Sequence, residues 1–446
     1  MESIFRREPT LRFFYRAADG KFVTRHIDPA SGALVPEQGT WAGTGFIFPF
    51  HYRLHIRWLD LGYWLVGLAS MAMLALLVSG VVIHRKLFAE LFTFRPQKRL
   101  PRASLDLHDL TGVFALPFHF VITLSGLVIF IGIYFPQAQV AVYGPGEQAQ
   151  DRYRQEAYGI YKRDKAGRPG TLASLDAMVG EAERHRPGGR AFFVRVWHPG
   201  DANGWVEVRR SYARDVTMHL DRVIFDAQTG ALLERVEAKP VMTVQRVIVG
   251  LHFIQFDHWT LRWLYFLAGL SVCVMIATGF VAWLEARRAR HEEKDLAGVR
   301  MVEGLTIGSV TGIIIATLAF FAINRLLPLG TSFAGQGRAA LEMWAFYLVW
   351  VLPFIHAWLR PACAWRAQAW VICLLALACA LLNAITTGDH LIRAFSSGMW
   401  SVAGMDALLL ALAMLSACMA TRLRRKAVQS SRAQAGAATL SAGRGS

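Results

Sequence analysis

The chain has 446 residues, of which 54% are hydrophobic and 18% are charged. Several apolar runs approach or exceed the roughly 20 residues that a membrane-spanning helix needs, so the composition excludes an ordinary water-soluble enzyme and predicts a polytopic membrane protein. The formal net charge of +16 comes from basic residues in short segments between the apolar runs. Neither a zinc-finger spacing nor another nucleic-acid motif accompanies it, which excludes nucleic acid as the expected partner.

The first 50 residues predict short strands joined by turns. The stretches "LRFFYR" (11–16) and "FVTRHI" (22–27) are rich in β-forming residues and flank an Asp-Gly turn. The next stretch, "IDPASGALV" (27–35), is typical of a tight turn, because Pro29 fixes one backbone angle and Gly32 accepts positive φ.

Seven apolar segments follow and predict seven membrane spans, at about 58–83, 110–135, 260–284, 304–326, 342–359, 368–387 and 401–421. Pro117 is expected to kink the second span. Glu342 and Asp406 lie near outer ends of spans and are expected to be solvated.

The short links between these spans alternate in charge. Four carry two to six basic residues each (85–102, 287–300, 360–366 and 422–426), whereas 328–340 and 388–398 carry one Arg each. Because cytoplasmic loops are enriched in Lys and Arg, this alternation places the C-terminus in the cytoplasm and the N-terminus outside.

The long polar stretch 136–246 then falls outside the membrane and predicts an α+β domain. Apolar residues at helical spacing indicate an amphipathic helix at 171–186. The stretches "AFFVRVW", "GWVEVRR" and "VTMHLDRVIF" after it predict antiparallel strands. The Ser-, Ala- and Gly-rich tail is expected to be disordered.

Part of the chain repeats. Asp226 and Gly230 in "FDAQTGALL" (225–233) follow Asp28 and Gly32 by 198 residues, and "MIATG" (275–279) follows "LLVSG" (76–80) by 199 residues. Fixed-period similarity indicates a duplicated unit of strands, turn, outer histidines, membrane helix and basic loop. The first copy has no counterpart of the membrane helix that enters the second copy, so residues 1–50 are expected to be the remnant of a first domain in a longer natural protein. The alternative is a reduced domain that functions as it stands.

The stretch "SGVVIHRKLFAELFTFRPQKRLPRASLDLHDLTGVFALPFHFVITLSGLVIF" (79–130), together with the two D-x-x-[ST]-G turns, resembles the PepSY-associated transmembrane helix proteins. The resemblance covers about residues 10–285; the C-terminal spans at 304–421 carry no independent motif. It implies kinship with iron-regulated inner-membrane proteins, some of which resemble haem-containing reductases of ferric siderophores. Full-length relatives begin with a membrane helix that carries a His near its inner end, which this chain lacks.

Histidines gather at two membrane levels, and ionisable residues in spans are functional candidates. His84 and His108 share the inner level, and His51, His55, His252 and His258 share the outer level. His51 and His55 lie on one helical face if their stretch is helical. His119 follows His108 by eleven residues, which in a continuous helix puts both on one face roughly 16 Å apart.

These two layers predict axial ligands of one or two b-type haems. The inner haem would use His84 and His108, and the outer haem His55 and His252, with His51 and His258 as alternates and His119 in either layer. No other metal site is expected. The alternative is that these histidines cap helix ends or lie at the headgroup level.

The sequence therefore predicts an all-α polytopic membrane bundle of about seven spans with an inserted α+β PepSY-like extracytoplasmic domain. The expected parts are a domain remnant (1–50), spans one and two (51–135), the PepSY-like domain (136–246), span three (247–286), spans four to seven (302–421) and a disordered cytoplasmic tail (422–446).

The predicted function is electron transfer by haem in the bacterial inner membrane, with reduction of ferric iron in siderophores on the outer face. The expected partners are membrane lipid, a ferric siderophore and an unidentified electron donor or partner protein. The alternative is a non-enzymatic PepSY module that binds peptide or a partner transporter; a third is a transporter built on the seven spans.

Overall fold

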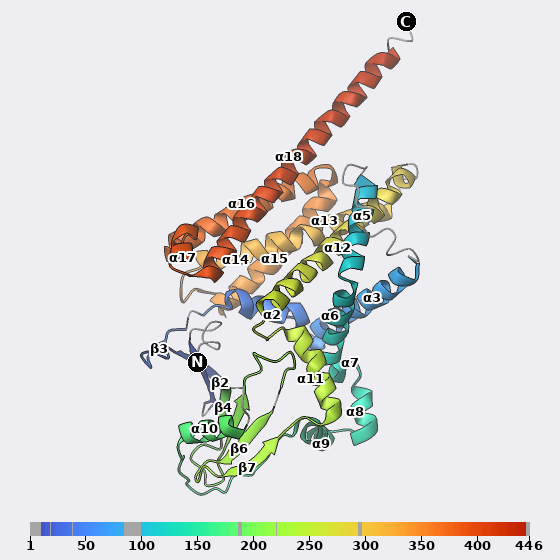
Figure 1. Cartoon of the computed structure of the whole chain (residues 1–446). Helices are drawn as coiled ribbons and strands as arrows, with labels where there is room; N and C mark the ends of the chain where they lie inside the picture. Colours follow the sequence, from blue (N-terminus) through green and yellow to red (C-terminus); the bar gives the residue numbers. More distant parts are fainter. Residues whose placement is uncertain are drawn as a thin grey trace. The chain divides into compact units, whose positions relative to one another are not determined.

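The computed structural model describes residues 10–17, 19–37, 39–83, 100–185, 190–219, 221–292 and 297–442 (Figure 1). The chain divides into two structural units that are each built from separate stretches. The first unit comprises Met1–Pro36, His51–Phe92 and Asp109–Cys273, and the second comprises Glu37–Phe50, Thr93–His108 and Val274–Ser446. Each unit is described below by itself.

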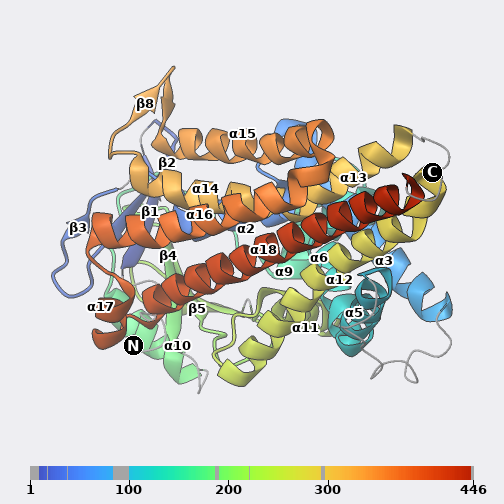
Figure 2. The same ribbon diagram turned by 90° about the horizontal axis from the view of Figure 1, so that it is seen from above.

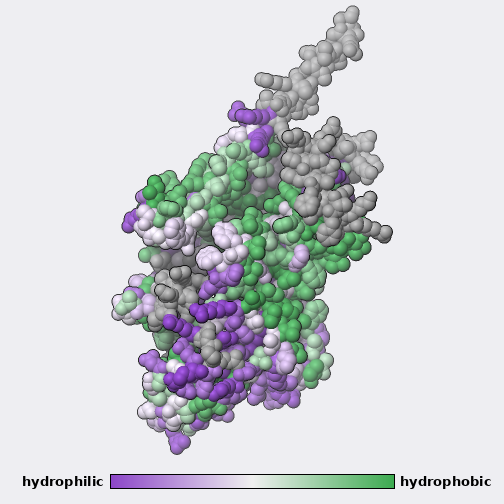
Figure 3. All heavy atoms as spheres, viewed as in Figure 1, coloured by the Kyte–Doolittle hydropathy of each residue, from purple (hydrophilic) through white to green (hydrophobic). Residues whose placement is uncertain are grey.

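Six helices in the described residues are long and apolar enough to cross a membrane, and a bent helix pair makes a seventh candidate, which confirms the expected polytopic bundle. The six spans are Trp58–Ile83, Trp259–Arg287, Gly298–Leu326, Arg338–Leu359, Pro361–Thr387 and Trp400–Arg425. In Figure 3 hydrophobic residues dominate the visible surface of the membrane-spanning helices, and hydrophilic residues gather over the α+β domain.

The second predicted span is broken. Helices α5 (Leu100–Phe114) and α6 (Leu116–Ile129) meet at an angle of 68° around Ala115. Pro117 lies in the first turn of α6, and a proline has no N–H for the preceding turn and clashes with the carbonyl four residues before it. The predicted kink is confirmed, and the single face that a continuous helix would give His108 and His119 does not exist.

In the first unit, residues 136–253 form the α+β domain followed by helix α11 (Pro240–Phe253). Helices α8 (Pro136–Tyr143), α9 (Glu147–Tyr158) and α10 (Leu175–His185) precede an antiparallel sheet in the order β4-β5-β6-β7. The strands are Ala191–Trp197, Trp205–Arg210, Arg222–Asp226 and Leu232–Val236. The predicted helix and first two strands are confirmed; the third strand is shorter than predicted, and β7 was not predicted.

Helix α10 closes one face of this sheet. Its buried Met178 and Ala182 pack with Val206, Val208 and Phe225 of β5 and β6 in one core cluster. Each of these strand residues is at most 2% exposed. The amphipathic pattern that predicts the helix is therefore the pattern that attaches it to the sheet.

The N-terminal stretch of the first unit forms a smaller antiparallel sheet of β1 (Leu11–Arg16), β2 (Phe22–Ile27) and β3 (Leu34–Val35). The bounds of β1 and β2 match the two predicted strands. In the membrane part of this unit, the short η1 (Trp58–Asp60) leads into α3 (Leu61–Ile83), which packs beside α6, and α7 (Ile131–Tyr134) follows α6.

The two D-x-x-[ST]-G turns have the same hydrogen bonds. The Gly32 N–H donates to the Asp28 carbonyl at 2.8 Å, and the Gly230 N–H donates to the Asp226 carbonyl at 3.0 Å. Ser31 and Thr229 donate their hydroxyls to the two Asp carboxylates at 2.6 and 3.1 Å. Both glycines have positive φ, 69° and 71°. The turns are thus equivalent in structure as well as in sequence, as a duplicated unit requires.

The second unit is a helical bundle. Its elements are α2 (Ala42–Arg53, whose last turn belongs to the first unit), α13 (Ala297–Val310), α14 (Gly312–Leu326), the hairpin of β8 (Ser332–Phe333) and β9 (Gln336–Gly337), α15 (Arg338–Leu359), α16 (Pro361–Thr387), α17 (Leu391–Ser396) and α18 (Trp400–Ala442). Figure 2 shows α16 running along α18, and Ile315, Ala376 and Leu409 lie in their shared core with α14. Helix α18 continues to Ala442, where a disordered tail was expected; its Ala, Arg, Lys and Gln residues are strong helix formers.

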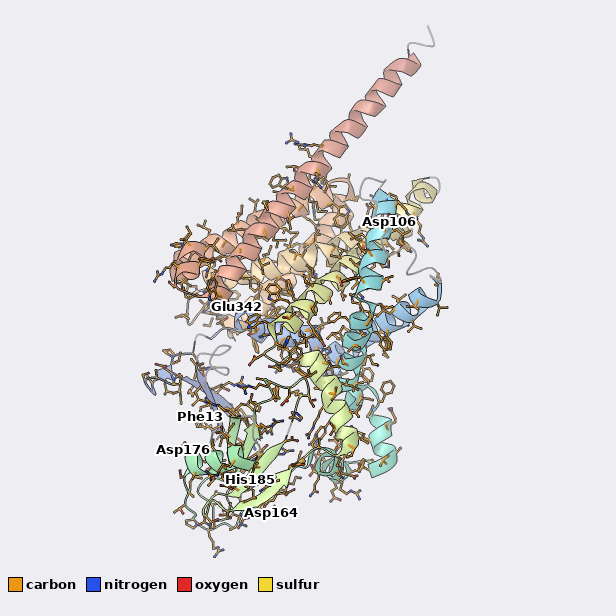
Figure 4. All side chains as sticks on the ribbon, viewed as in Figure 1. Phe13, Asp106, Asp164, Asp176, His185 and Glu342 are labelled. Carbon is orange, nitrogen blue, oxygen red and sulfur yellow. The ribbon has the colours of Figure 1, made fainter. Side chains whose placement is uncertain are left out.

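Two acidic side chains of this bundle differ from the expectation of solvated carboxylates. Glu342, labelled in Figure 4, has no exposed surface and accepts hydrogen bonds from Thr40 Oγ1 at 2.8 and 2.7 Å. Arg338 Nε lies 3.3 Å from the same carboxylate. Asp406 is 3% exposed and faces the Asn383 amide at 3.4 Å. Both predictions are wrong because neighbouring helices and polar side chains replace water around these carboxylates.

Candidate functional site

His51 and His252 form a close pair among those predicted site residues that the structure describes. His51 lies in the last turn of α2 and His252 in the last turn of α11, both in the first unit. Their ring centroids are 6.1 Å apart, and the ring planes are inclined by 33°. Each ring stands on its own helix, so two separate elements bring the imidazoles together.

The hydrogen bonds of His252 define which ring nitrogen carries its proton. His252 Nδ1 lies 3.0 Å from the Ile122 carbonyl and 3.0 Å from Ser125 Oγ, both on α6. Because a carbonyl oxygen only accepts, Nδ1 must be the protonated nitrogen. In the neutral ring the lone pair is then on Nε2, the nitrogen that a metal would take.

The electrostatics of the pair favour neutral rings. Burial lowers the pKa of His51 below the ordinary value of 6.5. Burial also lowers the pKa of His252, and the neighbouring His51 lowers it further, while the hydrogen bond to Ile122 acts in the opposite direction. Both imidazoles are therefore available as electron-pair donors at neutral pH.

The other two outer histidines lie outside this pair. Helix α2 ends at Arg53, and Leu54 and His55 have positive φ of 50° and 51°. His55 is therefore not on one helical face with His51, and the condition attached to that expectation fails. His258 is exposed, and its Nδ1 accepts the Leu261 N–H at 3.3 Å in the first turn of α12 (Trp259–Glu292). His258 therefore caps the start of a helix, which is the alternative to haem ligation given in the sequence analysis.

His119 lies close to this site in the first unit. It is completely buried on α6, three residues before Ile122, and hence one helical turn from the carbonyl that holds His252. Its Nε2 lies 3.0 Å from Ser271 Oγ of α12. Its Nδ1 has no hydrogen-bond partner in the described part of the chain. A buried unsatisfied imidazole nitrogen in a span is a feature that requires a functional or structural reason.

Of the two inner candidates, the structure places His108 only, in the second unit. His108 Nδ1 lies 2.8 Å from the Met275 carbonyl of α12, and the His108 ring lies against Gly279. His84 lies outside the described residues. Whether the two form a pair stays a prediction.

The His51–His252 pair presents two imidazole rings from separate helices, with centroids 6.1 Å apart. Imidazole nitrogen is a ligand type that haem iron takes. Tyr52, the residue after His51 in the chain, stacks on Phe130 at 5.6 Å, and Phe130 contacts Tyr63 at 5.2 Å. Within the described residues no group of three or more His, Cys, Asp or Glu could hold a bare metal ion.

The polar partners of His252 were not predicted from the sequence. Ser125 and Gly126 belong to "ITLSG" (122–126), which has the pattern of "LLVSG" (76–80) and "MIATG" (275–279). A search for further copies of that pattern would have found them. The Ile122 carbonyl belongs to the backbone, so the residue type at that position does not indicate the contact.

The fold and this site together define a class: a polytopic helical membrane protein with an inserted α+β domain and histidines held between helices. A family model described as the PepSY-associated TM region matches residues 2–286. The chain belongs to this family. It is similar to an uncharacterized protein of Pseudomonas aeruginosa, with 29% identity over 298 residues that cover 63% of this chain and 73% of the relative.

Proposed function

We propose that the protein is a haem-containing electron-transfer protein of the bacterial inner membrane that reduces ferric iron, in siderophore complexes, on the outer face. The observation that carries the proposal is the His51–His252 pair, with its 6.1 Å ring separation and its protonated His252 Nδ1. Membership of the PepSY-associated TM family supports the membrane part of the proposal.

The chain's own residues have defined roles in this proposal. His51 and His252 would hold the haem iron through their imidazoles, and Ile122 and Ser125 orient the His252 ring. Bound haem supplies a one-electron carrier. In the overall reaction an unidentified reduced donor loses one electron, and Fe³⁺ gains it and becomes Fe²⁺, which the oxygen-rich siderophore binds more weakly. His108 and His84 are the proposed ligands of a second haem at the inner level.

The first test is the visible spectrum of the full chain purified in detergent after expression with haem supply. A Soret band and a sharp α band after dithionite addition are expected. The absence of any Soret band would overturn the proposal and favour a non-enzymatic PepSY module that binds peptide or a partner protein.

A ligand test uses single alanine variants with a matched control. His252→Ala and His51→Ala should each remove the haem held by the outer pair. His258→Ala, which alters an exposed helix-capping histidine of the same level, should keep it. Equal haem content in all three variants would reject the ligand assignment. The haem content of His55→Ala tests the other predicted partner of His252. The haem content of His108→Ala tests the proposed ligand of the second haem.

Substrate reduction is tested with protein that has been reduced and freed of excess dithionite. Adding a ferric hydroxamate should return the haem spectrum to the oxidised form and produce Fe²⁺ that a ferrous chelator captures. A haem that stays reduced in its presence would contradict the substrate assignment while leaving the haem assignment intact.

A further inference from the structure

The same histidine contact occurs twice, once in each unit. His252 rests on "ITLSG" (122–126) of α6 in the first unit, and His108 rests on "MIATG" (275–279) of α12 in the second. The two histidines come from different helices, α11 and α5, and the two units share none of these residues. The recurrence therefore points to the five-residue pattern itself, an apolar residue, two spacers, Ser or Thr, and Gly.

The hydrogen bonds of the two contacts agree. Nδ1 of each histidine lies close to the carbonyl of the first residue of the pattern, at 3.0 Å for Ile122 and 2.8 Å for Met275. The hydroxyl of the fourth residue, Ser125 or Thr278, also lies 3.1 Å from that same carbonyl, although Thr278 donates over a shorter distance, 2.7 Å, to the Val274 carbonyl. A hydroxyl that bonds back to its own helix draws the carbonyl away from the regular ladder, which opens it to a further donor.

The glycine that ends the pattern makes room for the ring. A Cβ at Gly126 would lie 3.1 Å from His252 Cε1, and a Cβ at Gly279 would lie 3.0 Å from both Cε1 and Nδ1 of His108. These distances are shorter than ordinary van der Waals contact. A methyl group at either position would push the imidazole away from the carbonyl that orients it.

We propose that this pattern is a histidine seat, and that Gly126 and Gly279 are positioning residues for His252 and His108. The seat fixes the tautomer with the proton on Nδ1 and directs the Nε2 lone pair away from the supporting helix. The tautomer follows from these contacts alone, whereas ligation of haem iron by the Nε2 lone pair rests on the proposed function.

A third copy of the pattern supplies a matched control. In "LLVSG" (76–80) of α3, the Ser79 hydroxyl also donates to the Leu76 carbonyl at 3.1 Å. No described residue lies within 4 Å of a Cβ placed at Gly80. Gly80→Ala therefore makes the same chemical change, in the same sequence context, with no ring of a described residue to displace.

The tautomer is tested by ¹⁵N NMR of histidine-labelled protein in lipid bilayers, prepared without haem supply. Difference spectra with His252→Ala and His108→Ala assign the two rings. Each should show a protonated Nδ1 and an unprotonated Nε2. Gly126→Ala should convert the His252 signals to a mixture of tautomers, and Gly80→Ala should leave both rings unchanged. A wild-type His252 with its proton on Nε2, or an unaltered spectrum in Gly126→Ala, would overturn the seat.

Haem affinity provides the second readout. Loss of a contact that orients a metal-binding ring costs about 10–100-fold in metal affinity. Gly126→Ala should therefore weaken haem binding by His252 by that factor, and Gly80→Ala should leave it at the wild-type level. If Gly126→Ala keeps full haem affinity while His252→Ala loses haem, Gly126 does not position His252. The proposed function would be unaffected by that result. Absence of haem in the wild type would refute the proposed function, and the NMR result would still decide the seat.

Discussion

His51 and His252 share a site in which two positive charges would be costly. Their pKa values lie below the ordinary 6.5, because burial disfavours the charged rings and, for His252, because His51 is near. In the unfolded chain both rings keep ordinary values. As the pH falls below about 6.5 the unfolded state therefore binds more protons than the folded state, and the free energy of unfolding decreases.

This difference predicts that haem-free protein becomes less stable as the pH is lowered from 7.5 to 5.5. His252→Gln should lower the apparent melting temperature at pH 7.5 and flatten its decline with pH, because one of the depressed groups is gone. Thermal unfolding in detergent at several pH values measures both effects. His258→Gln is the control, since that ring is exposed. If the melting temperature of His252→Gln fell with pH as steeply as that of the wild type, the lowered pKa of His252 would not explain the decline.

The sequence predicted His55 as the partner of His252, with His51 as an alternate, whereas the structure places the His51 ring near His252. The stretch 42–58 contains no Gly or Asn after Arg53 that would announce a helix end. The helix nevertheless stops there, with Leu54 and His55 in the left-handed region that such residues rarely adopt. The end of α2 therefore depends on tertiary contacts. An error of a few residues in this helix end changes which histidine is the candidate ligand.

Among the elements, the two equivalent turns differ in one contact. Asp226 also forms an ion pair with Arg163 at 2.7 Å, whereas the Asp28 turn relies on its local hydrogen bonds. Burial raises the pKa of Asp226, but Arg163 and the turn hydrogen bonds outweigh burial and keep the pKa below 3.8. The turn is thus stable above that pH and loses this contribution only in stronger acid.

Asp226→Ala should therefore destabilise the β6–β7 hairpin by about 1–3 kcal/mol, the usual cost of removing one partner of charge-assisted hydrogen bonds. Hydrogen exchange measured by mass spectrometry should show faster exchange in peptides that cover residues 222–236. Asp28→Ala should accelerate exchange around its own turn by less. A larger effect at Asp28 would show that the Arg163 ion pair adds nothing.

The elements that the sequence predicted best are those with a strong local pattern. The spans are long apolar runs, strands β1 and β2 are rich in β-forming residues, and α10 has apolar residues at helical spacing. Strand β7, "LLERV", is too short to establish a period, and it pairs with β6 after the Asp226 turn. The break at Ala115 was predictable because Pro117 has a purely local effect.

For the whole molecule, the distribution of Arg and Lys predicts a C-terminus in the cytoplasm and the α+β domain outside. Alkaline phosphatase needs disulfides that form only outside the cytoplasm. Fused after Gly335, between α14 and α15, it should be active; fused after Ser446 it should be inactive, whereas green fluorescent protein there should fluoresce. The reverse pattern would invert the orientation and place the His51–His252 site at the cytoplasmic face.

The contact between Thr40 and Glu342 has a consequence for biosynthesis. The two residues are 302 positions apart in the chain. At a translation rate of about 5–20 residues per second, roughly 15–60 s pass between their emergence from the ribosome. During that interval the segment that precedes α2 has no Glu342 to bind, and the last turn of the same helix carries His51. Helix α2, whose last turn carries His51, therefore acquires this contact only after α15 has been made.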